Sequence, residues 1–132
     1  MFNKLSATVV FVQDLDNCRT FYQDTLGLKP LFDDDVSTGY QIDGHDLVLL
    51  KFAAAADMMS EEAIAFRKDT GYRVLLCLAV DDVDATYKTL TDKGVTFIKP
   101  PKSQHWGRRT AYFADPEGNL WELWHELPAE QN

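Results

Sequence analysis

The sequence predicts an α+β fold built from two tandem βαβββ modules, and two observations predict it. The first is an internal repeat. Residues 5–30 and residues 73–100 each contain an apolar strand ending in Val, then Asp-(Leu/Val)-Asp, an amphipathic helix, a Gly and a short strand ending in Lys-Pro. Matching Val12 with Val80 gives a period of about 68 residues, which is typical of a duplicated unit. The second is residues 111–126, where a turn with Pro and Gly separates two apolar runs and predicts a hairpin.

The first module is expected to begin with a strand over about residues 4–12, followed by a helix over about residues 15–26. Asp14 is a suitable N-cap for this helix, and Gly27 is a suitable stop because it tolerates positive φ. Apolar residues recur along the helix at the spacing of one buried face. Three short strands are then expected near residues 28–33, 36–42 and 46–52.

The second module is expected to repeat this order. Residues 73–80 predict a strand and residues 83–93 a helix, and three strands follow near residues 95–99, 108–114 and 119–126. The chain is thus read as a single domain, residues 1–132, with module one at about residues 1–52, a connector with a helix at residues 53–72 and module two at about residues 73–127.

The connector helix is expected to start at residues 60–62, where Ser-Glu-Glu gives a cap and two early acidic residues, and to end by Gly71. Its apolar residues either cover the core, lie on the surface or contact a neighbouring subunit; they are Met58, Met59, Ile64 and Phe66.

Composition narrows the functional classes. The chain has 45% hydrophobic and 26% charged residues, which is typical of a globular protein. A net charge of −8 argues against nucleic acid and anionic membrane as partners. No apolar run reaches the length of about 18 residues that a membrane span needs, and the N-terminus lacks the apolar core of a signal peptide. Cys18 and Cys77 have no metal-binding spacing, so a reduced cytoplasm is the expected location.

Four motifs together resemble those of the glyoxalase I/bleomycin-resistance/extradiol-dioxygenase superfamily, also called vicinal oxygen chelate proteins. They are Val-x-Asp-Leu-Asp at residues 12–16, Phe-Tyr-x-x-x-Leu-Gly-Leu at 21–28, Trp-Gly at 106–107, and Asp-Pro-Glu-Gly-Asn-Leu-x-Glu-Leu at 115–123. The resemblance implies that the two modules form a curled, cup-shaped mixed sheet and that the protein is a homodimer. It also implies a small-molecule ligand and, in the family's enzymes, a divalent metal in the cup.

The family's metal ligands come one each from the first and last strands of both modules. Carried over residue by residue, these positions are Ala7, Leu49, Leu75 and Glu122. Three of the four are apolar, so no cofactor is expected, although a divalent metal bound through other residues stays open. The three histidines are not expected to supply the missing metal ligands. His45 is expected in a turn, His105 in a loop, and His125 on the strand face opposite Glu122.

What remains is a cup with apolar walls and a few polar groups, the usual composition of a small-molecule site. The residues expected to line the cup and bind a ligand are Ala7, Val9, Phe11, Leu49, Arg73, Leu75, Cys77, Trp106, Arg108, Thr110, Tyr112, Glu122 and Trp124. Because an unpaired buried carboxylate is costly, Glu122 needs a proton or a cation, and Arg73 and Arg108 are the candidate partners. The alternative is a cup filled by its own side chains.

Three functions are compatible with this cup. The first is metal-independent binding of a hydrophobic or aromatic small molecule, including sequestration of an antibiotic or toxin. The second is an enzyme of the lyase, isomerase or dioxygenase type, with Glu122 as general base and Tyr112 or Arg108 polarising a carbonyl, with or without a divalent metal. The third is an interaction module without a ligand, for which the connector is the expected contact surface.

Overall fold

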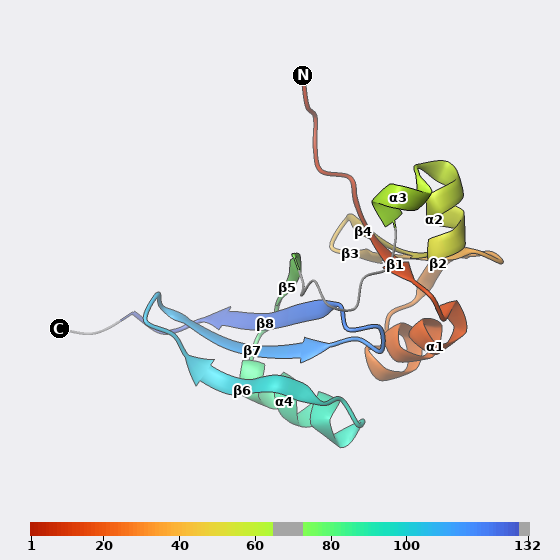
Figure 1. Ribbon diagram of the computed structural model, residues 1–132. Helices are drawn as coiled ribbons and strands as arrows, with labels where there is room; N and C mark the ends of the chain where they lie inside the picture. The colour runs from red at the N-terminus through yellow and green to blue at the C-terminus, as the bar shows by residue number, and fades with distance from the viewer. Residues whose placement is uncertain (65–72, 130–132) are drawn as a thin grey trace. The chain divides into compact units, whose positions relative to one another are not determined.

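The computed structural model describes residues 1–64 and 73–129, and the chain divides into two compact units, Met1–Gly71 and Tyr72–Asn132 (Figure 1). Each unit contains one βαβββ module with its own four-stranded mixed sheet. The sheets are curled but not closed (Figure 1). The predicted α+β fold with a duplicated module is therefore confirmed.

The first sheet contains β1 (Ala7–Val12), β2 (Pro30–Asp33), β3 (Ser37–Ile42) and β4 (His45–Lys51). Its strand order is β1-β4-β3-β2, with β1 parallel to β4 and the other pairs antiparallel. His45, expected in a turn, is instead the first residue of β4, where its Nε2 and the Thr8 hydroxyl form a hydrogen bond of 2.8 Å.

The helix of the first module starts and stops where its end signals predict. The Asp14 carboxylate accepts a hydrogen bond from the Asn17 amide, which caps α1 (Leu15–Thr20). The helix continues as a π-helical turn, η1 (Phe21–Thr25), and Gly27 follows at a φ of +77°.

The connector differs from its prediction. Within its described residues it contains two helices, α2 (Phe52–Met58) and α3 (Glu61–Ile64), in place of one. The predicted start of a helix near Ser60 is confirmed, because the Ser60 hydroxyl accepts from the Ala63 amide. Its predicted end and Phe66 lie outside the described residues. Ile64 is buried, whereas Met58 and Met59 are exposed.

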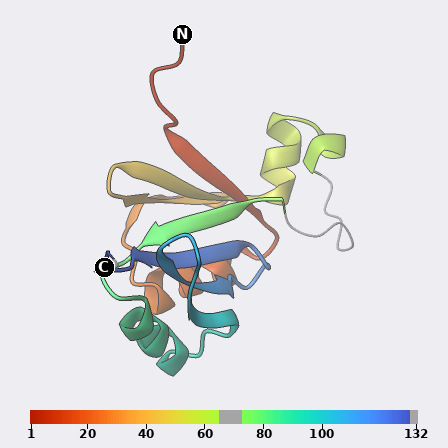
Figure 2. The ribbon, with the colours of Figure 1, turned by 90° about the vertical axis from the view of Figure 1, so that its left-hand side faces the viewer.

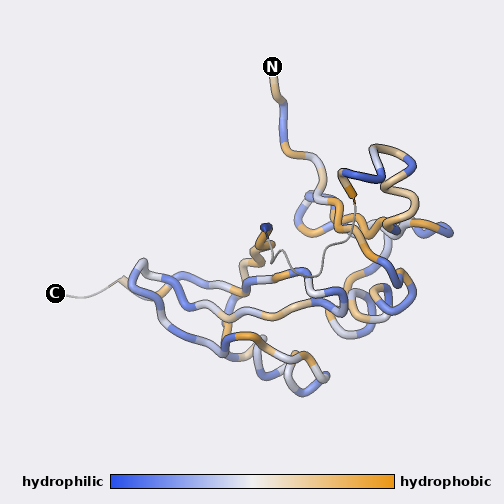
Figure 3. Tube along the Cα trace, viewed as in Figure 1, coloured by the Kyte–Doolittle hydropathy of each residue, from blue (hydrophilic) through white to orange (hydrophobic). Residues whose placement is uncertain are grey.

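Helices cover both faces of the first sheet (Figure 1). Val10 and Val12 of β1 are buried on the same side as Leu49 of β4, against the side chains of α1. On the other side a buried cluster joins the sheet to α2 and α3. It consists of Leu50 from β4, Ala55 from α2 and Ile64 from α3. Figure 3 shows α2 mostly in the hydrophobic colours, as a helix over a sheet requires.

The second sheet repeats the topology of the first. It contains β5 (Leu75–Ala79), β6 (Phe97–Ser103), β7 (Arg108–Ala114) and β8 (Leu120–Glu126), in the order β5-β8-β7-β6. The helix α4 (Val83–Asp92) lies against one face of this sheet in both ribbon views (Figures 1 and 2). Asp82 caps α4 as Asp14 caps α1, which confirms the match between the two Asp-x-Asp turns.

The second aspartate of each Asp-x-Asp turn pairs with an arginine. In the first module Arg19, from α1 itself, donates to Asp16 at 2.8 Å and to Asp33 of β2 at 2.6 Å. In the second module Arg109, from β7, donates to both oxygens of Asp84 at 2.6 and 2.8 Å. This bidentate pair lowers the pKa of the Asp84 carboxyl below its ordinary value. Both helices are thus held to their sheets through arginine.

Candidate functional site

The candidate site is the face of the second sheet that is turned away from α4, called the distal face below. Arg109 and His125 lie on the α4 side, since Arg109 pairs with Asp84 and the His125 Nδ1 accepts from the Val83 amide at 2.9 Å. Alternation then places their neighbours on the distal face. The distal face contains Leu75, Cys77, Arg108, Thr110, Tyr112, Glu122 and Trp124. The predicted facing of these seven residues is confirmed; their role in binding stays a prediction.

A hydrogen-bonded pair lies at the centre of the distal face. Tyr112 and Glu122 are directly opposite on β7 and β8, and the Tyr112 hydroxyl donates to Glu122 Oε1 at 2.7 Å. Glu122 is 8% exposed, so this donor offsets part of the cost of burying its carboxylate. Burial, opposed by a hydrogen bond with Thr110 and reinforced by Glu122, raises the pKa of Tyr112, so the phenol stays a donor.

The predicted pairing of Glu122 with an arginine is wrong within the described residues. Arg73 lies exposed just before β5, and none of the ion pairs in the described part of the chain includes Glu122. Arg108 instead lies with its guanidinium carbon 3.7 Å from the centre of the Trp124 ring. This cation–π contact turns a flat, charged surface toward the same face as the Tyr112–Glu122 pair.

Cys77 lies next to Glu122 on the other side, directly opposite it on β5. Burial, together with a hydrogen bond to Glu122 and the charge of that carboxylate, raises the pKa of the Cys77 thiol to about 11. A group with a raised pKa stays protonated until the pH exceeds that value. Cys77 is therefore a neutral thiol at physiological pH and a poor nucleophile, although it is exposed.

We predict that iodoacetamide alkylates Cys77 slowly at pH 8 and that the rate keeps rising with pH up to about 11. Glu122→Gln removes the negative charge that opposes ionisation, so alkylation at pH 8 is expected to become several-fold faster. The rates are measured by mass spectrometry in a Cys18→Ala background, which leaves one thiol. An ordinary thiol titration in the parent, or an unchanged rate in Glu122→Gln, would contradict the assignment.

The equivalent position in the first module carries no polar pair. Val9 lies opposite Val48 as Cys77 lies opposite Glu122, and Val48 lies opposite Gly39 as Glu122 lies opposite Tyr112. A Cβ at Gly39 would come within 2.0 Å of the Phe32 ring. Phe32 therefore occupies the place that the Tyr112 side chain has in the second module.

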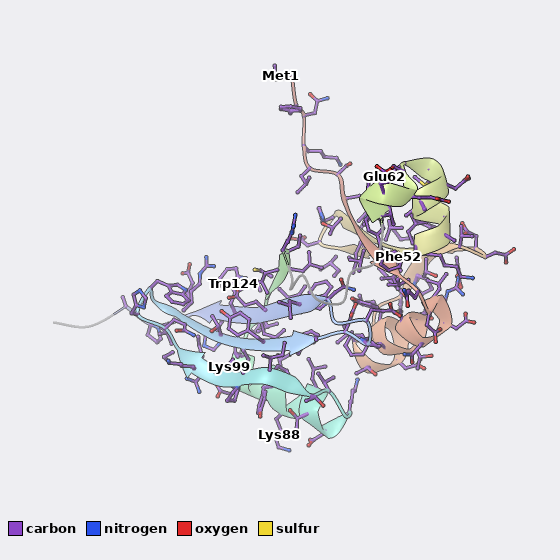
Figure 4. The ribbon with its side chains drawn as sticks, viewed as in Figure 1. Met1, Phe52, Glu62, Lys88, Lys99 and Trp124 are labelled. Carbon is purple, nitrogen blue, oxygen red and sulfur yellow. The ribbon has the colours of Figure 1, made fainter. Side chains whose placement is uncertain are left out.

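Two predicted lining residues of the first module are placed differently from the prediction. Leu49 is fully buried and lies opposite Val10, on the α1 side of its sheet, so its assignment to the cup is wrong. Phe11 shares a face with Val9 but packs against the cluster under α2, with its ring 6.2 Å from that of Phe52. Figure 4 labels Phe52 at the start of α2, beside β1. Ala7 and Val9 face away from α1, as expected.

The residues present do not fit the metal site of the family. With Val48 in place of Leu49, the four ligand positions are Ala7, Val48, Leu75 and Glu122, and three remain apolar. Metal ions in such sites need several oxygen or nitrogen ligands. Within residues 1–64 and 73–129, no group of three or more His, Cys, Asp or Glu residues is arranged to hold a metal ion. His105, in the loop after β6, contacts the exposed Trp106 ring edge-to-face.

A pocket at the edge of the distal face was not predicted. It has a volume of about 360 Å³ and is lined by Lys99, Pro100, Pro101, Lys102, Gln104 and Tyr112. The sequence predicts a strand only near residues 95–99 in this part of the chain. The strand β6 nevertheless continues to Ser103 as an edge strand with two register shifts. The Pro-Pro pair was the available signal, since a proline within a strand marks an edge or a bulge.

Comparisons with known proteins give the family. Over 127 residues the chain is 32% identical to the uncharacterized protein YraH of Bacillus subtilis (strain 168), covering 94% of this chain and 99% of YraH. A solved superfamily member from Sphaerobacter thermophilus is 28% identical, with a TM-score of 0.72 and coverage of 95% and 98%. A solved glyoxalase/bleomycin resistance protein/dioxygenase from Nocardioides has a TM-score of 0.84 at 22% identity, covering 100% of this chain and 91% of its own. Residues 4–123 match the family model, and the chain belongs to the Glyoxalase/Bleomycin resistance protein/Dioxygenase superfamily.

Proposed function

We propose that this protein binds a hydrophobic or aromatic small molecule on the distal face without a metal ion, as in the sequestration of an antibiotic or toxin. The observation that carries the proposal is the Tyr112–Glu122 pair, which lies amid apolar and aromatic side chains. A few converging polar groups within apolar walls fix the orientation of a ligand, while the walls supply affinity. The apolar ligand positions of the family's metal site support binding that does not use a metal.

The part of the distal face around Arg108 and Trp124 supports an aromatic ligand. Trp124 is half-buried beneath the Arg108 guanidinium, and Leu75 is 43% exposed on the neighbouring strand. Flat rings stack on such surfaces at a gain of about 0.5–1.5 kcal/mol per aromatic pair beyond area burial. Tyr112 donates to one oxygen of Glu122, and the other can accept a hydrogen bond from a ligand hydroxyl or amine.

The test is a titration with 2-naphthylmethanol, a neutral planar alcohol, followed by tryptophan fluorescence. Glu122→Gln is expected to weaken its binding at least about tenfold, because a hydrogen bond to a charged acceptor becomes a neutral one. Tyr112→Phe, which takes away the donor that orients Glu122, is expected to weaken it as well. Glu62→Gln, at an exposed carboxylate of α3 labelled in Figure 4, is the matched control and should leave binding unchanged.

Thermal unfolding of each variant separates a lost contact from a lost fold. Equal affinities in the parent and in a folded Glu122→Gln variant would overturn the assignment of Glu122. Absence of binding by this and other planar aromatic compounds would overturn the proposed function itself and favour an interaction module.

A second candidate is an enzyme of the lyase, isomerase or dioxygenase type. It is favoured by the same pair, since a buried carboxylate beside a phenol donor suits a general base with a group that polarises a carbonyl. Mass spectrometry of the bound compound after incubation separates the two candidates: an unchanged compound supports binding, and a product that disappears in Glu122→Gln supports catalysis. Elemental mass spectrometry of protein purified without chelator tests metal independence.

The same proposal includes a homodimer, which is common in the superfamily, and a cytoplasmic location without nucleic-acid or membrane partners. The net charge of −8 supports the absence of polyanionic partners. No helix in the described parts of the chain is both long and apolar enough to cross a membrane.

A further inference from the structure

The pocket beside Tyr112 owes its chemistry to the irregular path of β6. Phe97 lies opposite Phe113, Lys99 opposite Tyr112, and Lys102 opposite Thr110. From Phe97 to Lys99, β6 advances by two residues while β7 advances by one. From Lys99 to Lys102, β6 advances by three residues while β7 advances by two. Each interval contains an extra residue, as in a β-bulge.

The two extra residues decide which side chains face the pocket. With strict alternation, Phe97 and Lys99 would share a face, and Lys102 would lie on the other. The observed register instead turns Phe97 toward the α4 side, where its ring lies 4.6 Å from that of Tyr87. Lys99 and Lys102 both lie on the distal face, beside Tyr112 and Thr110. Figure 4 labels Lys99 on β6, in the same sheet as Trp124 of β8.

The two lysines form a positive site in an acidic protein. Both line the pocket, and neither has an ion-pair partner within the residues that the structure describes. By contrast, Lys88 on α4 pairs with Asp92 at 3.1 Å. Both lysines are exposed and line the same pocket, so an anion bound there is attracted by both ammonium groups. Gln104 is held in place because its side-chain amide donates to the buried Thr110 hydroxyl at 3.0 Å.

The remaining walls of the pocket are flat and apolar. They are contributed by Pro100, Pro101 and Tyr112, which line the pocket together with the two lysines and Gln104. At about 360 Å³ the pocket is large enough for a small planar molecule. A ligand with an aromatic ring and an acidic group would place the ring between prolines and tyrosine and the acid at the lysines.

We propose that the Lys99–Lys102 pocket binds the anionic group, a carboxylate or a phosphate, of a planar aromatic acid. The proposal rests on the proposed function and specifies its ligand class. Tyr112 lines the pocket and also donates to Glu122, so it joins the two parts of the site. A ligand spanning both would be an aromatic acid with a hydroxyl or amino group for Glu122.

The experiment compares 2-naphthoate, 2-naphthyl phosphate and the neutral 2-naphthylmethanol by isothermal titration calorimetry. The two acids are expected to bind at least about tenfold more tightly than the alcohol, with an advantage that falls as the salt concentration rises. The double variant K99Q/K102Q is expected to abolish this advantage and leave the alcohol unaffected. K99R/K102R, which keeps both charges, should retain most of it, and K88Q is the control at a lysine outside the pocket.

The outcomes separate this proposal from the one on which it rests. Equal binding of acids and alcohol in the parent protein, or equal weakening of all three by K99Q/K102Q, would overturn the proposed anion-binding pocket and leave the proposed function intact. Failure of all three compounds to bind would overturn both. Preference for the carboxylate or for the phosphate identifies which acid the pocket suits.

Discussion

Phe113→Ala is expected to lower the free energy of unfolding by about 3–5 kcal/mol, the range observed when a large buried aromatic side chain is truncated. Phe113 of β7 is fully buried on the α4 side of the second sheet. Its ring centre lies 5.4 Å from that of Phe97 and 6.3 Å from that of Trp121, which it parallels. The substitution removes the ring at the centre of this aromatic group and leaves a cavity.

Urea unfolding followed by tryptophan fluorescence measures this effect in the relevant half of the chain. All three tryptophans, at positions 106, 121 and 124, belong to the second module. The matched control is Phe2→Ala, because Phe2 is 91% exposed and its truncation should cost almost nothing. An unchanged urea midpoint in Phe113→Ala would show that this aromatic group does not hold the second module together.

Asp115→Ala is expected to lower the free energy of unfolding by about 2–4 kcal/mol. Asp115 is 5% exposed and organises the turn between β7 and β8. One of its oxygens accepts from the Glu117 amide at 2.9 Å and from the Asn119 amide at 2.8 Å, and the other accepts from the Asn119 side chain at 3.0 Å. Alanine leaves these donors without their acceptor and frees the turn that sets the register of Tyr112 against Glu122.

Urea unfolding followed by tryptophan fluorescence also tests this prediction. Asp115→Asn keeps one acceptor oxygen and is expected to lose less stability than Asp115→Ala. Asp35→Ala, at an exposed aspartate in another turn, is the control that should be close to neutral. If Asp115→Ala were as stable as the parent, the turn would be fixed by Gly118, at a φ of +88°, and by the strands alone.

The parts of the fold that the sequence predicts well are those with local signals at both ends. Asp14 and Asp82 each begin a helix with a side-chain cap, and Gly27 ends the first helix at positive φ. The start of α2 carries no such signal. Its N-cap is Lys51, which makes no side-chain cap hydrogen bond, so the helix depends on packing of Ala55 against the first sheet.

The facing of the candidate side chains was predicted well in one module and poorly in the other for a related reason. Alternation along β7 and β8 correctly groups Tyr112, Glu122 and Trp124, because the turn at Asp115 fixes their register. No comparable motif fixes the alignment of β4 with β8, and an error of one residue exchanged Val48 for Leu49. In a strand a shift of one residue moves a side chain to the opposite face. The basic pocket was missed because bulges in β6 override the alternation.

The Phe32 ring over Gly39 has a consequence for how many ligands the chain can hold. Duplication gives the two sheets the same strand order, and two identical halves would offer two equivalent sites. The first half, however, has no polar pair at the equivalent position, and the Phe32 ring occupies the space instead. The twofold repetition of the backbone therefore does not extend to its chemistry, and the proposed binding has a stoichiometry of one molecule per chain, set by the second half.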